Sequence, residues 1–141
     1  MRARPSVRVY PADVADLLTE NLRVIAALNA EGVEYIVVGG VAVNLHGLLR
    51  GTEDLDLFIR PTPGNVARLK RALRSIWDDP SIEEISADDL CGDYPAVRYG
   101  PPDTDLYLDI LTRLGDFARY GDLTAEIKTV EGTDIRVATP A

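Results

Sequence analysis

Residues 54–59 read Asp54-Leu55-Asp56-Leu57-Phe58-Ile59, so two carboxylates alternate with apolar residues. Side chains two residues apart in a β-strand point to the same face of the sheet. The leucines and Ile59 would then be buried on one face, whereas Asp54 and Asp56 would lie side by side on the other. The alternation therefore predicts a β-strand with one buried face and one acidic face.

A second acidic strand is predicted at 105–111. Its apolar side chains alternate with Asp105, Tyr107 and Asp109. If the two strands are neighbours in the sheet, their acidic faces coincide and Asp109 becomes a third carboxylate in the same cluster. Adjacent carboxylates repel each other and raise one another's pKa unless a cation neutralises them. Mg²⁺ prefers oxygen ligands of this kind, and two such ions can clamp the oxygens of a phosphoryl transfer.

The remaining pattern predicts an α+β fold, a small mixed β-sheet with helices packed on one face, in a single domain over residues 1–141. Helices are expected at 12–31, with a stop at Gly32, at 41–45 and at 65–77, the last capped by Asn65, and a short one after Ser86. Further strands are expected at 35–38 and 96–99. A hairpin is expected at 129–137, turning at Glu131-Gly132.

Composition excludes several classes of protein. Cys91 is the only cysteine, so an intrachain disulfide or a cysteine-based zinc site is impossible. No apolar run reaches the roughly 20 residues of a membrane span, and we expect a cytoplasmic protein without a membrane partner. The net charge of −8 disfavours a large nucleic-acid substrate, because nucleic-acid binding relies on Lys and Arg.

A glycine pair, Gly39-Gly40, follows the buried strand predicted at 35–38. Glycines between a strand and a helix N-terminus let phosphate approach free backbone N–H groups. Because the pair precedes Asp54 by about 15 residues, one loop could hold a triphosphate while the carboxylates hold its metal. A tight turn without a ligand is the alternative interpretation.

Residues 38–57, which read VGGVAVNLHGLLRGTEDLDL, resemble the signature of the DNA polymerase β-like nucleotidyltransferase superfamily. The segment with His46-Gly47 and then Arg-x-Thr-x-Asp-x-Asp is similar to the minimal bacterial nucleotidyltransferases. These include abortive-infection toxins of toxin–antitoxin systems and antibiotic nucleotidyltransferases. Weaker agreement extends the resemblance to Leu108-Asp109-Ile110-Leu111 and to 136–140.

The resemblance implies a role for each matching residue. Asp54 and Asp56 would bind two Mg²⁺ ions, and Asp109 would be the third catalytic carboxylate and help to deprotonate the acceptor hydroxyl. The nucleotide would be held by the loop residues Gly39, Gly40, Arg50 and Thr52, with Arg50 on phosphate or in a structural ion pair. His46 would pack against or cap a helix.

The resemblance also implies an activity, namely transfer of a nucleotidyl group from a nucleoside triphosphate such as ATP to a hydroxyl acceptor. The acceptor would be tRNA or a protein in a toxin-like enzyme, or a small molecule in an antibiotic-modifying enzyme. The alternative is a non-catalytic nucleotide-binding module that acts through a partner. Relatives continue into a further helix after the segment at 137–140, which this sequence lacks. A homodimer or a partner chain that completes the pocket is one explanation, and a minimal or truncated form is the other.

Overall fold

The computed structural model describes residues 10–38, 54–92, 96–114 and 118–139. Their α-helices are α1 (Tyr10–Ala30), α3 (Pro63–Ile76) and α4 (Ala87–Cys91), with short 3₁₀ helices η1 (Pro80–Glu84) and η2 (Tyr120–Asp122). The main sheet is built from β1 (Tyr35–Val38), β2 (Asp54–Ile59), β3 (Ala96–Tyr99), β4 (Tyr107–Leu111), β7 (Ala125–Val130) and β8 (Thr133–Ala138). A separate pair consists of β5 (Arg113–Leu114) and β6 (Ala118–Arg119).

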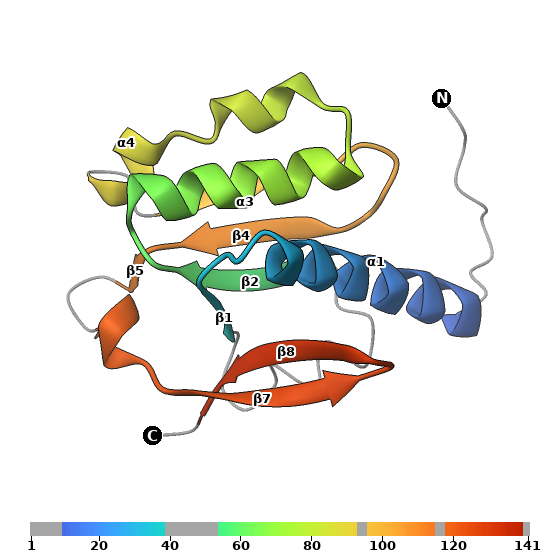
Figure 1. Ribbon diagram of the computed structural model, residues 1–141. Helices are drawn as coiled ribbons and strands as arrows, with labels where there is room; N and C mark the ends of the chain where they lie inside the picture. Colours follow the sequence, from blue (N-terminus) through green and yellow to red (C-terminus); the bar gives the residue numbers. More distant parts are fainter. Residues whose placement is uncertain (1–9, 39–53, 93–95, 115–117, 140–141) are drawn as a thin grey trace.

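The six-stranded sheet is mixed and open, with the strand order β3-β4-β2-β1-β8-β7 (Figure 1). β2 runs antiparallel to β1 and parallel to β4, while β8 runs parallel to β1. β3 and β7 form the two edges through antiparallel pairs with β4 and β8. The α+β class and the mixed sheet are confirmed.

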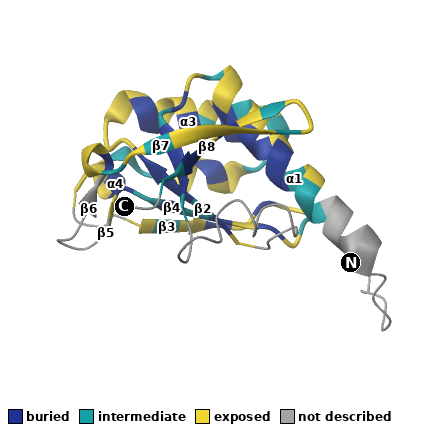
Figure 2. Ribbon diagram, turned by 90° about the horizontal axis from the view of Figure 1, so that it is seen from below, coloured by how far each residue is buried: buried dark blue, intermediate teal, exposed yellow. Residues whose placement is uncertain are grey.

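The main core lies between the helices and one face of this sheet. α1 and α3 pack against each other, and their apolar side chains meet the inward residues of β2. The alternation predicted for 54–59 is confirmed, because Leu55, Leu57 and Ile59 are buried in this core. The opposite face carries a smaller cluster of Ile36, Phe58 and Tyr120. Figure 2 shows β7 mostly exposed at the other end of the sheet from the acidic strands.

α1 ends where a glycine adopts a left-handed conformation. Gly32 has φ +69°, and its N–H donates to the carbonyl of Asn29 while the Val33 N–H donates to that of Leu28. This pair of bonds satisfies two helix carbonyls that would otherwise lack partners. The stop predicted at Gly32 is confirmed, and the chain then turns directly into β1.

The predicted cap of α3 is wrong. The helix begins at Pro63, and Thr62 is its N-cap, with its hydroxyl accepting from the Asn65 N–H at 3.2 Å. Asn65 is fully buried, and its side-chain amide bonds to the backbones of Glu34 and Arg60. Proline suits the first helical turn, because its missing N–H is not needed there.

Most of the other boundaries agree with the sequence, but β7 begins at Ala125 and not at the predicted residue 129. α4 is capped by the Ser86 hydroxyl, and β7 and β8 form the hairpin that turns at Glu131 and Gly132. β4 begins at Tyr107 instead of residue 105, after a turn in which Asp103 has φ 61°. The helix predicted at 41–45 lies outside the described residues. No helix in the described ranges has the length and apolar character of a membrane span.

Candidate functional site

The two acidic strands are neighbours, which is the condition under which the sequence predicts that their acidic faces coincide. In the parallel pair of β2 and β4, Asp56 lies opposite Asp109, and Asp54 lies opposite Tyr107. Directly opposed residues share a face of the sheet, so all three carboxylates project from the face that the helices leave uncovered. Asp105 was predicted on the same face, but it lies outside the strand, because β4 begins two residues later.

Asp56 is the most perturbed carboxylate of this cluster. Partial burial, followed by the nearby charge of Asp109 and a side-chain hydrogen bond with it, raises the pKa of Asp56 to about 6. The charge of Asp54 acts in the same direction, and that of Arg98 opposes it. Adjacent strands therefore force negative groups together at a place where water screens them incompletely.

Arg98 of β3 is a cation that contacts the carboxylates of this face. It lies opposite Asp109 in the antiparallel pair of β3 and β4. Its Nη2 forms an ion pair with Asp54 Oδ1, and its Nε lies 3.6 Å from Asp109 Oδ1. The guanidinium carbon lies 4.3 Å from the centre of the Tyr107 ring. A single side chain thus links β3, β4 and β2 across the acidic face.

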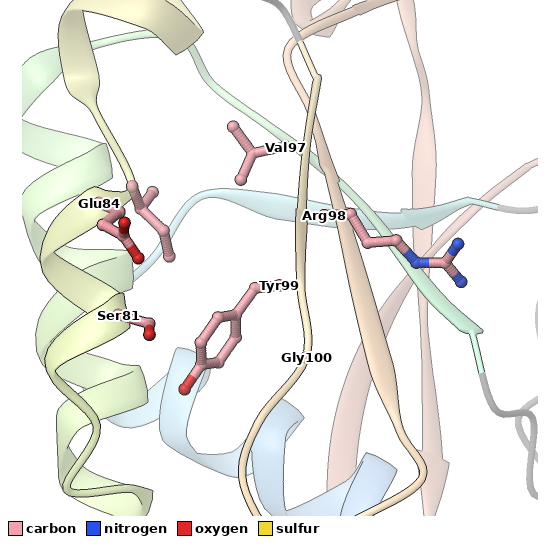
Figure 3. A pocket seen from close by; sticks show the side chains of 7 residues that line it. Ser81, Glu84, Val97, Arg98, Tyr99 and Gly100 are labelled. Atoms are coloured by element: carbon pink, nitrogen blue, oxygen red, sulfur yellow. The ribbon is translucent and has the colours of Figure 1, made fainter.

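Figure 3 shows a pocket whose lining includes Arg98, but the guanidinium of Arg98 extends away from this pocket, across β4 toward β2. That pocket has a volume of about 250 Å³ and includes Ser81, Glu84 and Tyr99 in its lining. The Tyr99 hydroxyl donates to Asp79 Oδ2 at 2.7 Å, behind the sheet as seen from the carboxylates. The pocket and the carboxylate face are therefore separate features on opposite sides of β3.

The ion pairs of Arg98 contribute little free energy. The side chain of Arg98 is 56% exposed and that of Asp54 is 53% exposed, so water screens their attraction. Ion pairs this exposed contribute about 0–1 kcal/mol. A cation that binds the carboxylates more strongly than Arg98 does can therefore displace its guanidinium.

The carboxylate oxygens of this face are the kind of ligand that Mg²⁺ prefers. Their side chains, however, are not arranged as the ligands of a metal ion. Asp54, Asp56 and Asp109 offer only oxygen ligands, and the raised pKa of Asp56 marks negative charge that a cation would relieve. In the ranges that the structure describes, however, no three His, Cys, Asp or Glu side chains form a group that could hold a metal ion. The guanidinium of Arg98 already contacts two of the three carboxylates.

The remaining predicted site residues, Gly39, Gly40, Arg50 and Thr52, lie outside the described residues, as does His46. β1 ends at Val38, which lies opposite Asp56. The chain therefore leaves β1 next to the carboxylates, and the predicted glycine turn begins at the following residue.

Sequence reasoning missed Arg98. Its strand was predicted at 96–99, and alternation within that strand would have placed Arg98 and Ala96 on one face. The sequence held no signal that β3 pairs with β4 instead of another strand, or that Arg98 falls opposite Asp109. Strand pairing depends on packing between distant segments, and alternation within a single strand does not specify it.

The observed features define an α+β protein with an open mixed sheet and a carboxylate face bridged by an arginine. No protein-family model matches the chain, and no curated protein or solved structure shows significant similarity to it.

Proposed function

We propose that the chain is a Mg²⁺-dependent nucleotidyltransferase, which moves a nucleotidyl group from a nucleoside triphosphate to a hydroxyl acceptor. The observation that carries the proposal is the register of β2 and β4, which puts Asp56 directly opposite Asp109 and keeps Asp54 on the same face. The resemblance of residues 38–57 to nucleotidyltransferases supports it independently of that register.

The proposed roles follow from the chemistry of each group. Asp54, Asp56 and Asp109 would hold Mg²⁺, which when bound neutralises charge on the phosphates and on the attacking and leaving oxygens. The acceptor hydroxyl oxygen forms a bond to the α-phosphorus, and the bond between that phosphorus and the pyrophosphate oxygen breaks. Asp109 would receive the proton of the hydroxyl. Such a reaction depends on positioning and electrostatics more than on covalent catalysis.

The acceptor class is a narrower proposal. A toxin-like enzyme that modifies tRNA or a protein is our first candidate, and an antibiotic-modifying enzyme is the second. The net charge of −8 favours a protein or a small molecule over tRNA. Growth arrest on expression that Asp56→Asn relieves would identify the toxin, and drug resistance that the same change removes would identify the second enzyme.

The activity is tested with nucleoside triphosphates labelled at the α-phosphate, Mg²⁺, and pools of tRNA, protein and aminoglycoside or lincosamide acceptors. We expect the wild type to transfer label and release pyrophosphate, and Asp54→Asn and Asp56→Asn each to lower the rate at least about 100-fold, as loss of a group essential to transition-state stabilisation does.

The matched control is Asp88→Asn, which makes the same change at an exposed position on the helix side of the sheet. It should label acceptors at the wild-type rate. Equal labelling by the wild type and both site variants would contradict the proposal, as would the absence of labelling together with an absence of Mg²⁺ binding.

A second candidate is a nucleotide-binding module without catalysis. The contact of Arg98 with two of the three carboxylates favours it, because a resident guanidinium could replace the metal permanently. Such a module would bind a triphosphate with equal affinity in Mg²⁺ and in EDTA, whereas the proposed enzyme would require Mg²⁺.

A further inference from the structure

Arg98 contacts the same oxygen atoms that a bound cation would use. It reaches Oδ1 of Asp54 and Oδ1 of Asp109, which belong to different strands, and these strands meet side by side. A divalent cation that takes these two oxygen atoms as ligands has to displace the guanidinium from them. Arg98 and a divalent cation therefore compete for Asp54 and Asp109.

We propose that Arg98 exchanges partners, holding Asp54 and Asp109 when no divalent cation is bound and contacting the nucleotide phosphates once a cation has displaced it. The inference rests on the proposed function, since it concerns the same carboxylates. It assigns to Arg98 a contact with the nucleotide substrate. It also explains why binding of the metal would favour binding of the nucleotide.

Displacement is easy in this geometry. Arg98 lies on the edge strand β3, and more than half of its side chain is exposed, so its ion pairs are screened by water. A divalent cation carries twice the charge and would also relieve the repulsion between Asp56 and Asp109, which lie directly opposite each other in the sheet. The stronger attraction therefore belongs to the metal.

The released guanidinium stays near the site. It lies over the ring of Tyr107, which is opposite Asp54 in the neighbouring strand and is 45% exposed. Stacking on an exposed aromatic ring can retain a guanidinium after its ion pairs have broken. A free guanidinium next to bound metal suits a phosphate, because its planar fork matches two phosphate oxygens.

The exchange is tested on the full chain with two probes. Mn²⁺ binding is followed by the loss of the paramagnetic resonance signal of free Mn²⁺, and binding of α,β-methylene-ATP in Mg²⁺ is followed by calorimetry. Arg98→Gln should tighten Mn²⁺ binding by about threefold to fivefold, the factor equivalent to an exposed ion pair near the upper end of the usual range. It should weaken analogue binding by roughly tenfold, as loss of a charge-assisted contact does.

Two further variants separate this exchange from general effects. Arg71→Gln removes the same charge from an equally exposed arginine, whose Nε lies 3.4 Å from Glu31 Oε2 on the helix side, and it should change neither affinity. Tyr107→Leu removes the ring beneath Arg98 without changing the charge. It should tighten Mn²⁺ binding by a smaller factor, and it keeps the test available if Arg98→Gln fails to fold.

The outcomes are distinct. Opposite changes in the two affinities in Arg98→Gln support the exchange, and so does tighter Mn²⁺ binding in Tyr107→Leu. Unchanged or weaker Mn²⁺ binding by Arg98→Gln overturns the inference while leaving the proposed function intact, and tighter Mn²⁺ binding with unchanged analogue binding overturns the phosphate contact. If neither the wild type nor the variants bind Mn²⁺, the proposed function falls as well.

Discussion

Asp56 and Asp109 face each other across two adjacent parallel strands, and their mutual repulsion makes the protein sensitive to pH. The pKa of Asp56 is raised from 3.8 to about 6, so the folded state retains a proton that the unfolded chain releases between about pH 4 and pH 6. The contribution of this group to stability therefore decreases as pH rises through that window, which is the reverse of a salt-bridged carboxylate.

Replacing Asp56 with Asn removes this titration. We expect Asp56→Asn to be more stable than the wild type at pH 7, and to lose less stability between pH 4.5 and pH 7 than the wild type does. Urea unfolding in EDTA at several pH values measures the difference, and Asp88→Asn is the control. Parallel stability curves for the wild type and Asp56→Asn would contradict the account of Asp56.

Asn65 ties the start of α3 to the ends of two strands. Its Oδ1 accepts from the Glu34 N–H at 2.8 Å, and its Nδ2 donates to the carbonyls of Glu34 and Arg60 at 2.9 and 3.0 Å. Asn65→Ala should lower the free energy of unfolding by about 2 kcal/mol, because the Glu34 N–H loses its partner, whereas the carbonyls of Glu34 and Arg60 keep their bonds from the N–H groups of Arg60 and Thr62. Thr62→Ala, which removes only the helix cap, should cost about 1 kcal/mol.

Asn65→Asp gives a sharper test of the same network. The aspartate can still accept from Glu34, but its second oxygen would face two carbonyl oxygens. We expect a loss similar to that in Asn65→Ala at pH 7, with partial recovery at low pH, where the protonated carboxyl can donate. A neutral effect of Asn65→Asp at pH 7 would show that its Nδ2 bonds contribute little.

The β7–β8 hairpin depends on two residues with positive φ. Glu131 has φ 49° and Gly132 has φ 81°, the combination found in tight hairpin turns. Gly132→Ala should destabilise the protein by about 1 kcal/mol, because alanine adopts this conformation with strain. Glu131→Asn should stabilise the protein, by a smaller amount than Gly132→Ala destabilises it, because asparagine adopts positive φ with less strain than glutamate. Thermal unfolding measures both changes, and equal midpoints in all three proteins would refute the argument.

The Tyr99 hydroxyl lowers the pKa of Asp79 by donating to its carboxylate at 2.7 Å. In Tyr99→Phe the Asp79 titration should move up toward its ordinary value, which carbon NMR of the carboxyl groups can follow. The stabilising contribution of this bond is present at neutral pH and is lost as pH falls through the lowered pKa, so the variant should differ least from wild type in acid. Tyr107→Phe, which removes a hydroxyl from the opposite face, should leave the Asp79 titration unchanged.

Several features could be predicted from local sequence because their causes are local. The alternation at 54–59 depends on strand geometry alone, and it correctly separated buried Leu57 from the carboxylates beside it. Gly32 and the Glu131-Gly132 turn were identified because backbone conformation there favours particular residues. The role of Asn65 was misjudged, since its partners at Glu34 and Arg60 lie outside its own helix.

The sequence by itself determined which residues can share a face, and so paired Asp54 with Asp56 and predicted Asp109 as a candidate third carboxylate. Only the tertiary structure decided that β4 lies beside β2 in a register that places Asp109 against Asp56, and that β3 brings Arg98 over both strands. The physical reason is that the two properties depend on interactions of different range along the chain. Side-chain direction follows from the backbone of one strand, whereas register is selected by the burial of apolar side chains from all the strands and helices together.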